Sequence, residues 1–404
     1  MDAAALSTLG LYISIPFCRS KCTYCNFSSG VYPAGEHARY IERLVEDLRG
    51  AGAWARRMGA ELPRRVDTVY LGGGTPSLLE PGLLLRLFTA VRGEFDLEPE
   101  AEITVECAPG QLAGPTLDAM AACGVNRVSL GVQSFVDREA RESGRLHSRA
   151  VVEEDVRRLR AAGIGNLNLD LIAGLAGQTF LSWEESLGAL ADAGTPHASI
   201  YMLEVDEDSR LGRELLAGGT RYRAGLVPGD DAIARMYERA IAHLAQAGLV
   251  QYEISNFSRP GWESRHNLRY WQRRPYLGLG LDASSMLREA KPSSGELPRV
   301  LRSTTTDDLK AYLAGPAQEE TECLPAARQL EEAWFLGLRL NAGVEVAELE
   351  REFGTTLVAP ARETAEWLAS EGLLAFEAET VRLTARGRLL ANEVFQEFLA
   401  EPIS

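Results

Sequence analysis

Residues 12–25 carry the pattern that decides the fold, and they read Tyr12-Ile13-Ser14-Ile15-Pro16-Phe17-Cys18-Arg19-Ser20-Lys21-Cys22-Thr23-Tyr24-Cys25. The apolar run Leu11–Phe17 is short, and runs of this kind form buried strands. Three cysteines follow it directly with the spacing C-x3-C-x2-C. The sequence therefore predicts a buried strand that leads into a loop carrying three thiols.

Beyond this loop, short apolar runs alternate with helical patterns up to about residue 205. The predicted strands are Leu11–Phe17, Val66–Leu71, Glu102–Cys107, Arg127–Val132, Leu167–Ile172 and Ala198–Leu203. The predicted helices between them are Ala38–Met58, Gly82–Gly93, Pro115–Cys123, Ala150–Ala162 and Phe180–Ala193. This repetition predicts an α/β fold with parallel strands and right-handed crossovers. Six units in a domain at 1–228 favour a partial (β/α)6 barrel, with an open doubly wound sheet as the alternative.

The rest of the chain divides into two further regions with different predicted secondary structure. A connecting region at 229–325 begins with an amphipathic helix at 229–249, and we expect 250–300 to be irregular, with a loop at Pro292–Pro298. From residue 326 the order is helix, helix, helix, hairpin and a last helix. That order is typical of a winged-helix module, so we expect a C-terminal α+β winged-helix-like domain at 326–404.

The composition excludes several classes of protein. Of 404 residues, 46% are hydrophobic and 25% are charged, which is ordinary for a globular chain and unlike a disordered or collagen-like one. There is no run of 18 apolar residues and no secretory signal, so we expect a cytoplasmic protein. The net charge of −15 argues against nucleic acid as a partner, because phosphate contacts need clustered Lys and Arg. We therefore expect the winged-helix-like domain to serve as a lid or docking module rather than to bind DNA.

The three clustered cysteines indicate a metal centre. A structural zinc site is one interpretation, but it needs four ligands, and the loop offers three thiolates with no fourth Cys or His nearby. Three thiolates suit a 4Fe–4S cluster in which one iron is left open to an exchangeable ligand. The sequence therefore favours iron–sulfur over zinc at Cys18, Cys22 and Cys25.

Polar side chains stand at the ends of the following predicted strands. The second strand closes with Gly72-Gly73-Gly74-Thr75-Pro76, and the third, fourth and fifth end near Glu106, Gln133 and Asp170. Arg145 lies in the loop Gly144-Arg145-Leu146-His147. The carboxyl ends of parallel strands share one face, so these groups are expected to converge. Two carboxylates, an amide and a guanidinium suit a ligand with a ribose, an ammonium and a carboxylate.

These motifs together resemble a known family. The cysteine spacing and the glycine motif resemble the radical S-adenosylmethionine (SAM) superfamily, and YISIPFCRSKCTYCNF, LGGGTPS, GVQSF, GRLHS and NLDLIAGLAGQT together resemble the anaerobic coproporphyrinogen-III oxidase family. The resemblance implies a 4Fe–4S cluster whose open iron is chelated by SAM. It implies that a set of residues binds the cofactors, namely Tyr12, Tyr24, Gly73, Gly74, Thr75, Glu106, Gln133, Arg145 and Asp170.

Within that family, three features favour the heme chaperone (HemW) branch over the enzyme. The enzyme pattern continues to a fourth cysteine, where this chain has Phe27. The enzyme also carries a long extension before its cysteine loop, whereas 17 residues precede Cys18 here. The stretch His266-Asn267-Leu268-Arg269-Tyr270-Trp271 reproduces the H-N-x-x-Y-W motif of the chaperone branch.

The resemblance makes His266 the expected heme ligand. Imidazole is a usual ligand of heme iron, Arg265 and Arg269 are candidates for pairing with propionates, and Tyr270, Trp271 and Tyr276 offer flat apolar faces. The alternative is a histidine whose hydrogen bonds are satisfied within the fold.

The expected function is a heme-binding chaperone that transfers heme to an unidentified acceptor protein, with a membrane-associated acceptor among the candidates. We expect no turnover of coproporphyrinogen III and assign no catalytic residue. The alternatives are an oxygen-independent coproporphyrinogen-III dehydrogenase and another radical SAM reaction.

Overall fold

The computed structural model describes residues 7–292, 297–315 and 319–399, and its centre is a curved sheet. Six of its strands run parallel in chain order, each hydrogen-bonded to the next. They are β1 (Leu9–Ile15), β3 (Arg65–Gly73), β4 (Asp96–Cys107), β5 (Arg127–Gln133), β6 (Asn166–Ala173) and β7 (His197–Met202). This arrangement confirms the predicted partial (β/α)6 barrel.

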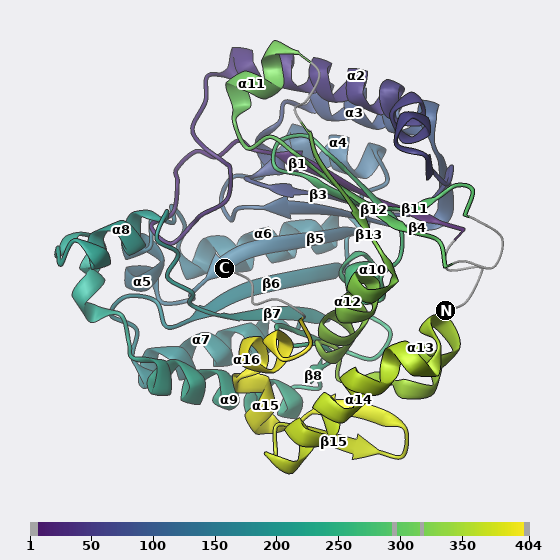
Figure 1. Ribbon diagram of the computed structural model, residues 1–404. Helices are drawn as coiled ribbons and strands as arrows, with labels where there is room; N and C mark the ends of the chain where they lie inside the picture. Colours follow the sequence, from purple (N-terminus) through teal and green to yellow (C-terminus); the bar gives the residue numbers. More distant parts are fainter. Residues whose placement is uncertain (1–6, 293–296, 316–318, 400–404) are drawn as a thin grey trace.

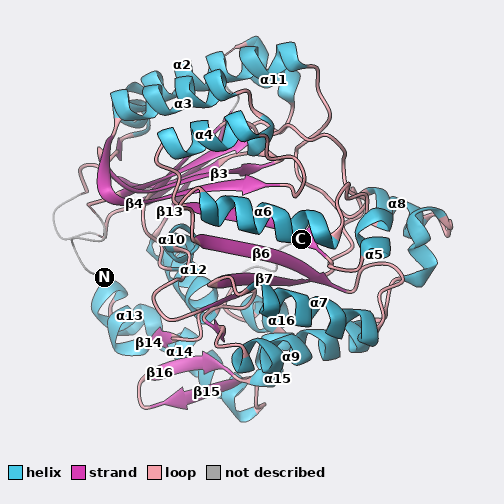
Figure 2. Cartoon of the chain, turned by 180° about the vertical axis from the view of Figure 1, so that it is seen from behind, coloured by secondary structure: helices cyan, strands magenta, loops and turns pink. Residues whose placement is uncertain are grey.

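Helices cover the outer face of these strands (Figures 1 and 2). They are α2 (Ala34–Met58), α3 (Pro81–Glu94), α4 (Gly114–Ala122), α6 (Arg149–Ala161), α7 (Phe180–Ala193) and α9 (Asp230–Gln246). In β1, Leu9, Leu11, Ile13 and Ile15 are fully buried in the same hydrophobic core as residues of these helices. Because side chains alternate along a strand, the even-numbered residues of β1 face the interior of the barrel.

The prediction that residues 250–300 are irregular was wrong, and regular elements continue from there to residue 324. They form β8 (Val250–Gln251), β9 (Asn256–Ser258), α10 (Arg265–Trp271), β10 (Tyr276–Leu279), β11 (Ser284–Glu289), β12 (Val300–Thr305), α11 (Leu309–Ala314) and β13 (Glu319–Leu324). The strands extend the barrel sheet at both edges: β10 pairs parallel with β1, and β9 pairs antiparallel with β7. The short β2 (Ala60–Glu61) pairs with β11. Residues 229–325 therefore belong to the body of the barrel, while part of the predicted loop Pro292–Pro298 lies outside the described residues.

The C-terminal part has its own hydrophobic core, which includes Trp334 stacked on Phe398. Its elements are α12 (Ala326–Leu338), β14 (Val344–Glu345), α13 (Val346–Phe353), α14 (Thr355–Ser370), β15 (Leu374–Glu377), β16 (Thr380–Leu383), α15 (Ala385–Leu389) and α16 (Ala391–Gln396). The predicted order of three helices and a hairpin is confirmed. A small additional strand, β14, pairs with β16 to complete a three-stranded sheet.

The two ends of the barrel differ in what closes them. The short helices α5 (Asp137–Glu142) and α8 (Arg210–Leu216) lie near the carboxyl ends of the strands, while α10 lies toward the opposite end (Figure 1). We call the first end the mouth and the second end the floor. Chemistry in barrels of this kind takes place at the mouth.

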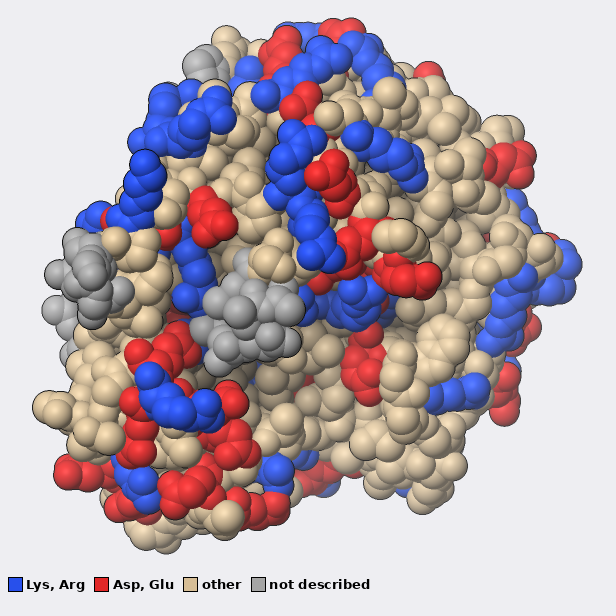
Figure 3. Space-filling model, turned by 90° about the vertical axis from the view of Figure 1, so that its right-hand side faces the viewer, with Lys and Arg blue, Asp and Glu red and all other residues tan. Residues whose placement is uncertain are grey.

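The surface carries mixed charge. On the face drawn in Figure 3, basic side chains are interspersed with acidic ones rather than gathered into one basic stripe. Among the residues that the structure describes, no helix combines the length and the apolar character that a membrane span requires.

Candidate functional site

A cavity of about 500 Å³ opens at the mouth of the barrel. Its lining brings together most of the residues that the sequence singled out, namely Cys18, Cys22, Tyr24, Cys25, Gly73, Gly74, Thr75, Glu106, Gln133, Arg145 and Asp170. Tyr12 does not line the cavity; its ring stacks on that of Tyr70, with 6.2 Å between the ring centroids. The predicted convergence at the strand ends is therefore found for every one of these residues except Tyr12.

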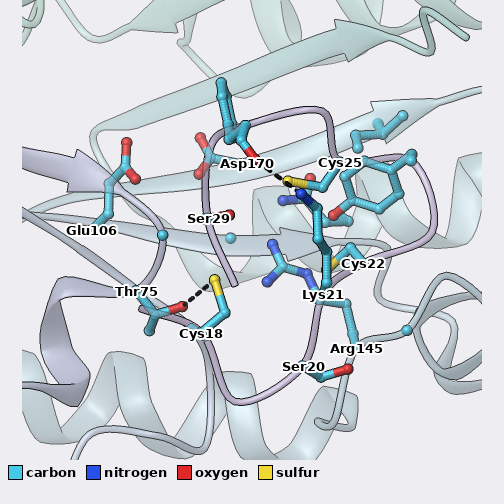
Figure 4. Close-up of a pocket in the computed structure, with 18 of the residues that line it drawn as sticks. Cys18, Ser20, Lys21, Cys22, Cys25, Ser29, Thr75, Glu106, Arg145 and Asp170 are labelled. Atoms are coloured by element: carbon cyan, nitrogen blue, oxygen red, sulfur yellow. Dashed lines mark hydrogen bonds between the residues drawn. The ribbon is translucent and has the colours of Figure 1, made fainter. Parts of the chain in front are cut away.

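Backbone hydrogen bonds fix the cysteine loop over the cavity. The amide of Cys18 donates to the carbonyl of Gly30 at 2.8 Å, and the amide of Gly30 donates to Pro16 at 2.9 Å. The ammonium of Lys21 crosses the loop to donate to the carbonyl of Phe27 at 3.0 Å. Figure 4 shows the three cysteines on this loop and Glu106 across the cavity from it.

The three thiols are free and half-buried, and burial raises the pKa of Cys18 and of Cys25. Within the described part of the chain, no three His, Cys, Asp or Glu side chains converge tightly enough to hold one metal ion. Ligation of a cluster by Cys18, Cys22 and Cys25 stays a prediction from the sequence.

The glycine segment joins the end of β3 to the cysteine loop. The amide of Gly74 donates to Ile15 at 2.9 Å, and the amide of Thr75 donates to Phe17 at 2.8 Å. A Cβ at position 74 would lie 2.8 Å from the carbonyl oxygen of Phe17, so a side chain there would force the two segments apart. Gly73 has a φ of 98°, which favours glycine. The Thr75 hydroxyl faces the Cys18 sulfur at 3.9 Å (Figure 4).

Glu106 is a carboxylate held in a half-buried position on the cavity wall. Burial raises the pKa of Glu106 to about 7, although the Tyr70 hydroxyl donates a hydrogen bond of 2.8 Å to its Oε1. A cationic partner stabilises the ionised form of such a carboxylate, because its charge offsets the cost of removing the carboxylate from water. Glu106 is therefore suited to an ammonium group in the cavity.

Gln133 and Arg145 are held in unusual positions on the cavity wall. Gln133 has a φ of 68° beside an irregularity in the β5–β6 pairing, and its Oε1 is buried without a hydrogen-bond partner among the described residues. Arg145 stays charged despite burial, because Tyr24, Cys22 and Asp170 raise its pKa. An acceptor without a partner and a half-buried cation are features of a site built for a polar ligand.

Asp170 forms hydrogen bonds within the protein that the sequence did not indicate. It accepts hydrogen bonds from the Ser129 hydroxyl at 3.0 Å and from the Asn168 amide at 2.6 Å. These neighbours hold the carboxylate in place at the cavity wall, which leaves part of its acceptor capacity for a ligand.

Sequence reasoning missed two residues that shape the cavity. Tyr70 lies two positions before the glycine segment and holds Glu106. Gly131 lies two positions before Gln133, and a side chain there would collide with the guanidinium of Arg145. Each lies two residues before a predicted site position on the same strand, so its side chain or Cα faces the same side of the sheet. That spacing is the signal that could have identified both residues.

Comparison with known proteins gives the family. Residues 12–190 match the family model described as the radical SAM superfamily, and residues 324–390 match the HemN C-terminal domain. A protein named heme chaperone HemW from Lactococcus lactis subsp. lactis is 33% identical, with 97% of this chain and 98% of that protein covered. One of the same name from Escherichia coli is 32% identical, with 98% and 99% covered. The chain belongs to the HemW family.

The chain is also similar to a mouse protein and to a solved structure. A mouse protein named radical S-adenosyl methionine domain-containing protein 1, mitochondrial, is 31% identical over 98% of this chain and 89% of its own length. The solved structure of coproporphyrinogen III oxidase (HemN) from Escherichia coli has a TM-score of 0.80 at 22% identity, with 97% of this chain and 90% of that chain covered. At this identity the likeness shows the fold alone.

The HemW-type motif at residues 266–271 does not form an open heme site. His266 is 1% exposed and lies at the floor, outside the cavity. Its Nδ1 forms a hydrogen bond of 2.9 Å with the Thr68 hydroxyl, and its Nε2 forms one of 2.8 Å with the Tyr270 hydroxyl. Burial lowers the pKa of His266 to about 3, so the ring is neutral. Both ring nitrogens are hydrogen-bonded within the protein in this structure, and the role of His266 as an axial heme ligand stays a prediction.

The two arginines near His266 also bind groups of the protein. Arg269 is fully buried, forms an ion pair with Asp67 and donates to the carbonyls of Thr8 at 3.1 Å and Pro275 at 2.8 Å. Arg265 donates to the carbonyl of Glu100 at 2.6 Å. In this structure the guanidinium of Arg269 binds groups at the floor of the barrel, and its pairing with a propionate stays a prediction.

Proposed function

We propose that this chain is a heme chaperone that carries a SAM-bound 4Fe–4S cluster and passes heme to an acceptor protein. The observation that supports it best is the similarity, over nearly the whole chain, to proteins named heme chaperone HemW. The acceptor is a protein whose identity stays open, with a membrane-associated protein among the candidates. Nucleic acid is not a partner in this proposal.

The cluster is held by Cys18, Cys22 and Cys25. As ligands the thiols lose their protons, and iron stabilises the thiolates that burial alone disfavours. When bound, the cluster and SAM supply one-electron chemistry. Thr75 and the Gly74 backbone hold the loop against β3, so they set where the cluster lies.

The remaining polar groups of the cavity are chemically suited to bind SAM. The Glu106 carboxylate accepts from the methionyl ammonium, and the buried Oε1 of Gln133 accepts from a ligand hydroxyl or ammonium. Arg145 offers a half-buried cation for a carboxylate, and Asp170 offers its remaining acceptor capacity to a ribose. Tyr12 supports this wall through Tyr70 rather than by touching the ligand.

Heme is the cargo, and we propose that its apolar face meets the rim of the cavity. Phe27 and Leu146 line the cavity mouth and are 62% and 65% exposed, and Val205 stands beside them. Exposed apolar groups gathered beside a cavity mark a binding surface, and a porphyrin presents a broad apolar face to such a rim. Lys21 lies on the same rim and offers a cation to a propionate.

A cytoplasmic location completes the proposal. A cluster with an open iron and three thiolate ligands needs a reducing compartment, because free thiols persist there. The described helices include none that would span a membrane.

The test is anaerobic purification, reconstitution with iron and sulfide, and titration with hemin. We expect a Soret band that saturates near one heme per chain and moves to added apomyoglobin as a probe acceptor. Phe27→Asp and Leu146→Asp should weaken heme binding by about tenfold, while Trp367→Asp, on the distant C-terminal domain, should not. Incubation with coproporphyrinogen III, SAM and a reductant should yield no protoporphyrinogen. Product formed over many turnovers would establish the dehydrogenase alternative instead.

A further inference from the structure

We propose that the hydroxyl of Ser29 donates a hydrogen bond to the sulfurs of Cys18 and Cys25 when these bind the cluster, and that it thereby raises the reduction potential of the cluster. The inference rests on the proposed function, in which the three cysteines hold a 4Fe–4S cluster. It assigns a task to a side chain of the cysteine loop that is not itself a ligand.

Ser29 is a buried polar residue on the wall of the cavity. It is 7% exposed, and it lines the cavity together with the three cysteines. Its Oγ is buried without a hydrogen-bond partner among the residues that the structure describes. A buried hydroxyl without a partner costs free energy, so its presence on a cavity wall indicates a bond that is made to a bound group.

The groups that Ser29 acts on are the two thiols on either side of it. Figure 4 shows Ser29 between Cys18 and Cys25. Burial raises the pKa of both thiols, and the Ser29 hydroxyl opposes that rise at each of them, as a donor close to a sulfur does. The Thr75 hydroxyl, 3.9 Å from the Cys18 sulfur, acts in the same way on Cys18. Ser29 therefore influences two of the three sulfurs.

Backbone hydrogen bonds on both sides hold Ser29 in this place. The amide of Ser29 donates to the carbonyl of Phe27 at 2.7 Å. The next residue, Gly30, donates to the carbonyl of Pro16 at 2.9 Å and accepts from the amide of Cys18 at 2.8 Å. A donor that is fixed in this way needs no reorientation at the moment when charge is added beside it.

A donor in this position favours the reduced form of the cluster. Reduction by an external one-electron donor adds one negative charge, and no bond breaks and no proton moves. The sulfur ligands carry part of that charge, so a hydrogen bond to them is stronger after reduction than before it. The Ser29 hydroxyl therefore makes the cluster easier to reduce.

The preceding residue, Ser28, offers a matched control. Its hydroxyl donates to the Asp282 carboxylate at 2.9 Å, and Ser28 is not among the residues that line the cavity. The same substitution at two adjacent positions thus removes a hydroxyl beside the sulfurs in Ser29→Ala and a hydroxyl beside a carboxylate in Ser28→Ala.

The test is a potentiometric titration of the anaerobically reconstituted chain with dithionite, without SAM, followed by the electron paramagnetic resonance signal of the reduced cluster. Iron and sulfide analysis shows whether each variant carries a full cluster. We expect Ser29→Ala to make reduction about fivefold less favourable, which at about 59 mV per tenfold for a one-electron couple lowers the potential by about 41 mV. Ser29→Thr, which keeps the hydroxyl, and Ser28→Ala should both stay within about twofold of the wild type.

An unchanged potential in Ser29→Ala at full cluster content would overturn the inference and leave the proposed function standing. An equal fall in Ser28→Ala would also overturn it, because the effect would then belong to the loop as a whole. If Ser29→Ala takes up no cluster, Ser29→Thr decides. A full cluster at the wild-type potential in that variant supports the inference, and no cluster there overturns it. A wild-type chain that takes up no cluster would overturn the proposed function itself.

Discussion

The mouth and the floor of the barrel use similar polar residues in opposite ways. At the mouth, Gln133 has a buried oxygen without a partner among the described residues, and Glu106 is a carboxylate whose pKa burial raises to about 7. At the floor, both nitrogens of His266 are hydrogen-bonded, and Glu102 accepts from two backbone amides. Polar groups left without partners at the mouth are therefore available to a ligand, whereas those at the floor hold the fold together.

The largest expected effect is at the cysteine loop. Cys22→Ser should abolish the cluster, because two thiolates cannot replace three, and the folding stability of the metal-free chain should change by less than about 0.5 kcal/mol. Iron and sulfide analysis after anaerobic reconstitution measures the first, and denaturant unfolding measures the second. The matched control is Cys323→Ser, an exposed cysteine that should leave the cluster intact. A full cluster in Cys22→Ser would contradict the assignment of Cys22 as a cluster ligand.

Breaking the floor should affect stability rather than binding. Asp67→Asn leaves the buried Arg269 without its charge partner, which should lower the free energy of unfolding by about 3 kcal/mol. Urea unfolding monitors the change. Asp96→Asn is the control, because its pair with Arg64 is exposed and should contribute less than about 1 kcal/mol. Equal effects of the two substitutions would contradict the contrast between floor and surface.

Glu106→Ala should affect binding rather than stability. Loss of a charged hydrogen bond should weaken SAM binding by about 1–3 kcal/mol, as calorimetry on the reconstituted protein can measure. Folding stability should not fall, because the change removes a carboxylate whose burial is unfavourable. Glu100→Ala, an exposed neighbour on the same strand, serves as the control. Unchanged SAM affinity would exclude Glu106 from the site.

A further prediction at the mouth is a pH dependence of SAM binding. The pKa of Glu106 is raised to about 7, so its contribution to the stability of the ligand-free fold is present below its ordinary pKa of 4.5 and is lost as the pH rises toward 7. SAM binding has the opposite dependence, because the ammonium needs the carboxylate. Below pH 7 the affinity should fall by up to about tenfold per pH unit. Glu106→Gln should show a flat profile over the same range, and a wild-type profile equally flat would contradict the role of Glu106.

The sequence predicted the mouth far better than the floor. A predicted strand is followed at short spacing by Cys18, Cys22 and Cys25. Later strands end at Glu106, Gln133 and Asp170, so the order of residues along the chain is enough to locate the site. The floor depends on contacts between distant residues, such as His266 with Thr68 and Arg269 with Asp67. No local pattern shows that a histidine has two buried hydroxyls beside it.

The strands after residue 250 were missed for a related reason. β8 and β9 have two and three residues, and β10 has four, so their alternation is too short to recognise. They form because the barrel offers open edges at β1 and β7, where backbone groups need partners. That need arises in the folded sheet and leaves little trace in the sequence.

The most direct test of the account is the electron paramagnetic resonance spectrum of the reduced, reconstituted cluster with and without SAM. The account predicts that SAM changes the spectrum of the wild-type chain, because the open iron at the mouth takes SAM as its ligand. His266→Phe at the floor should show the same change, whereas Glu106→Ala should need about tenfold more SAM to reach it. A wild-type spectrum that saturating SAM leaves unaltered would contradict the claim that the mouth is the ligand-binding end.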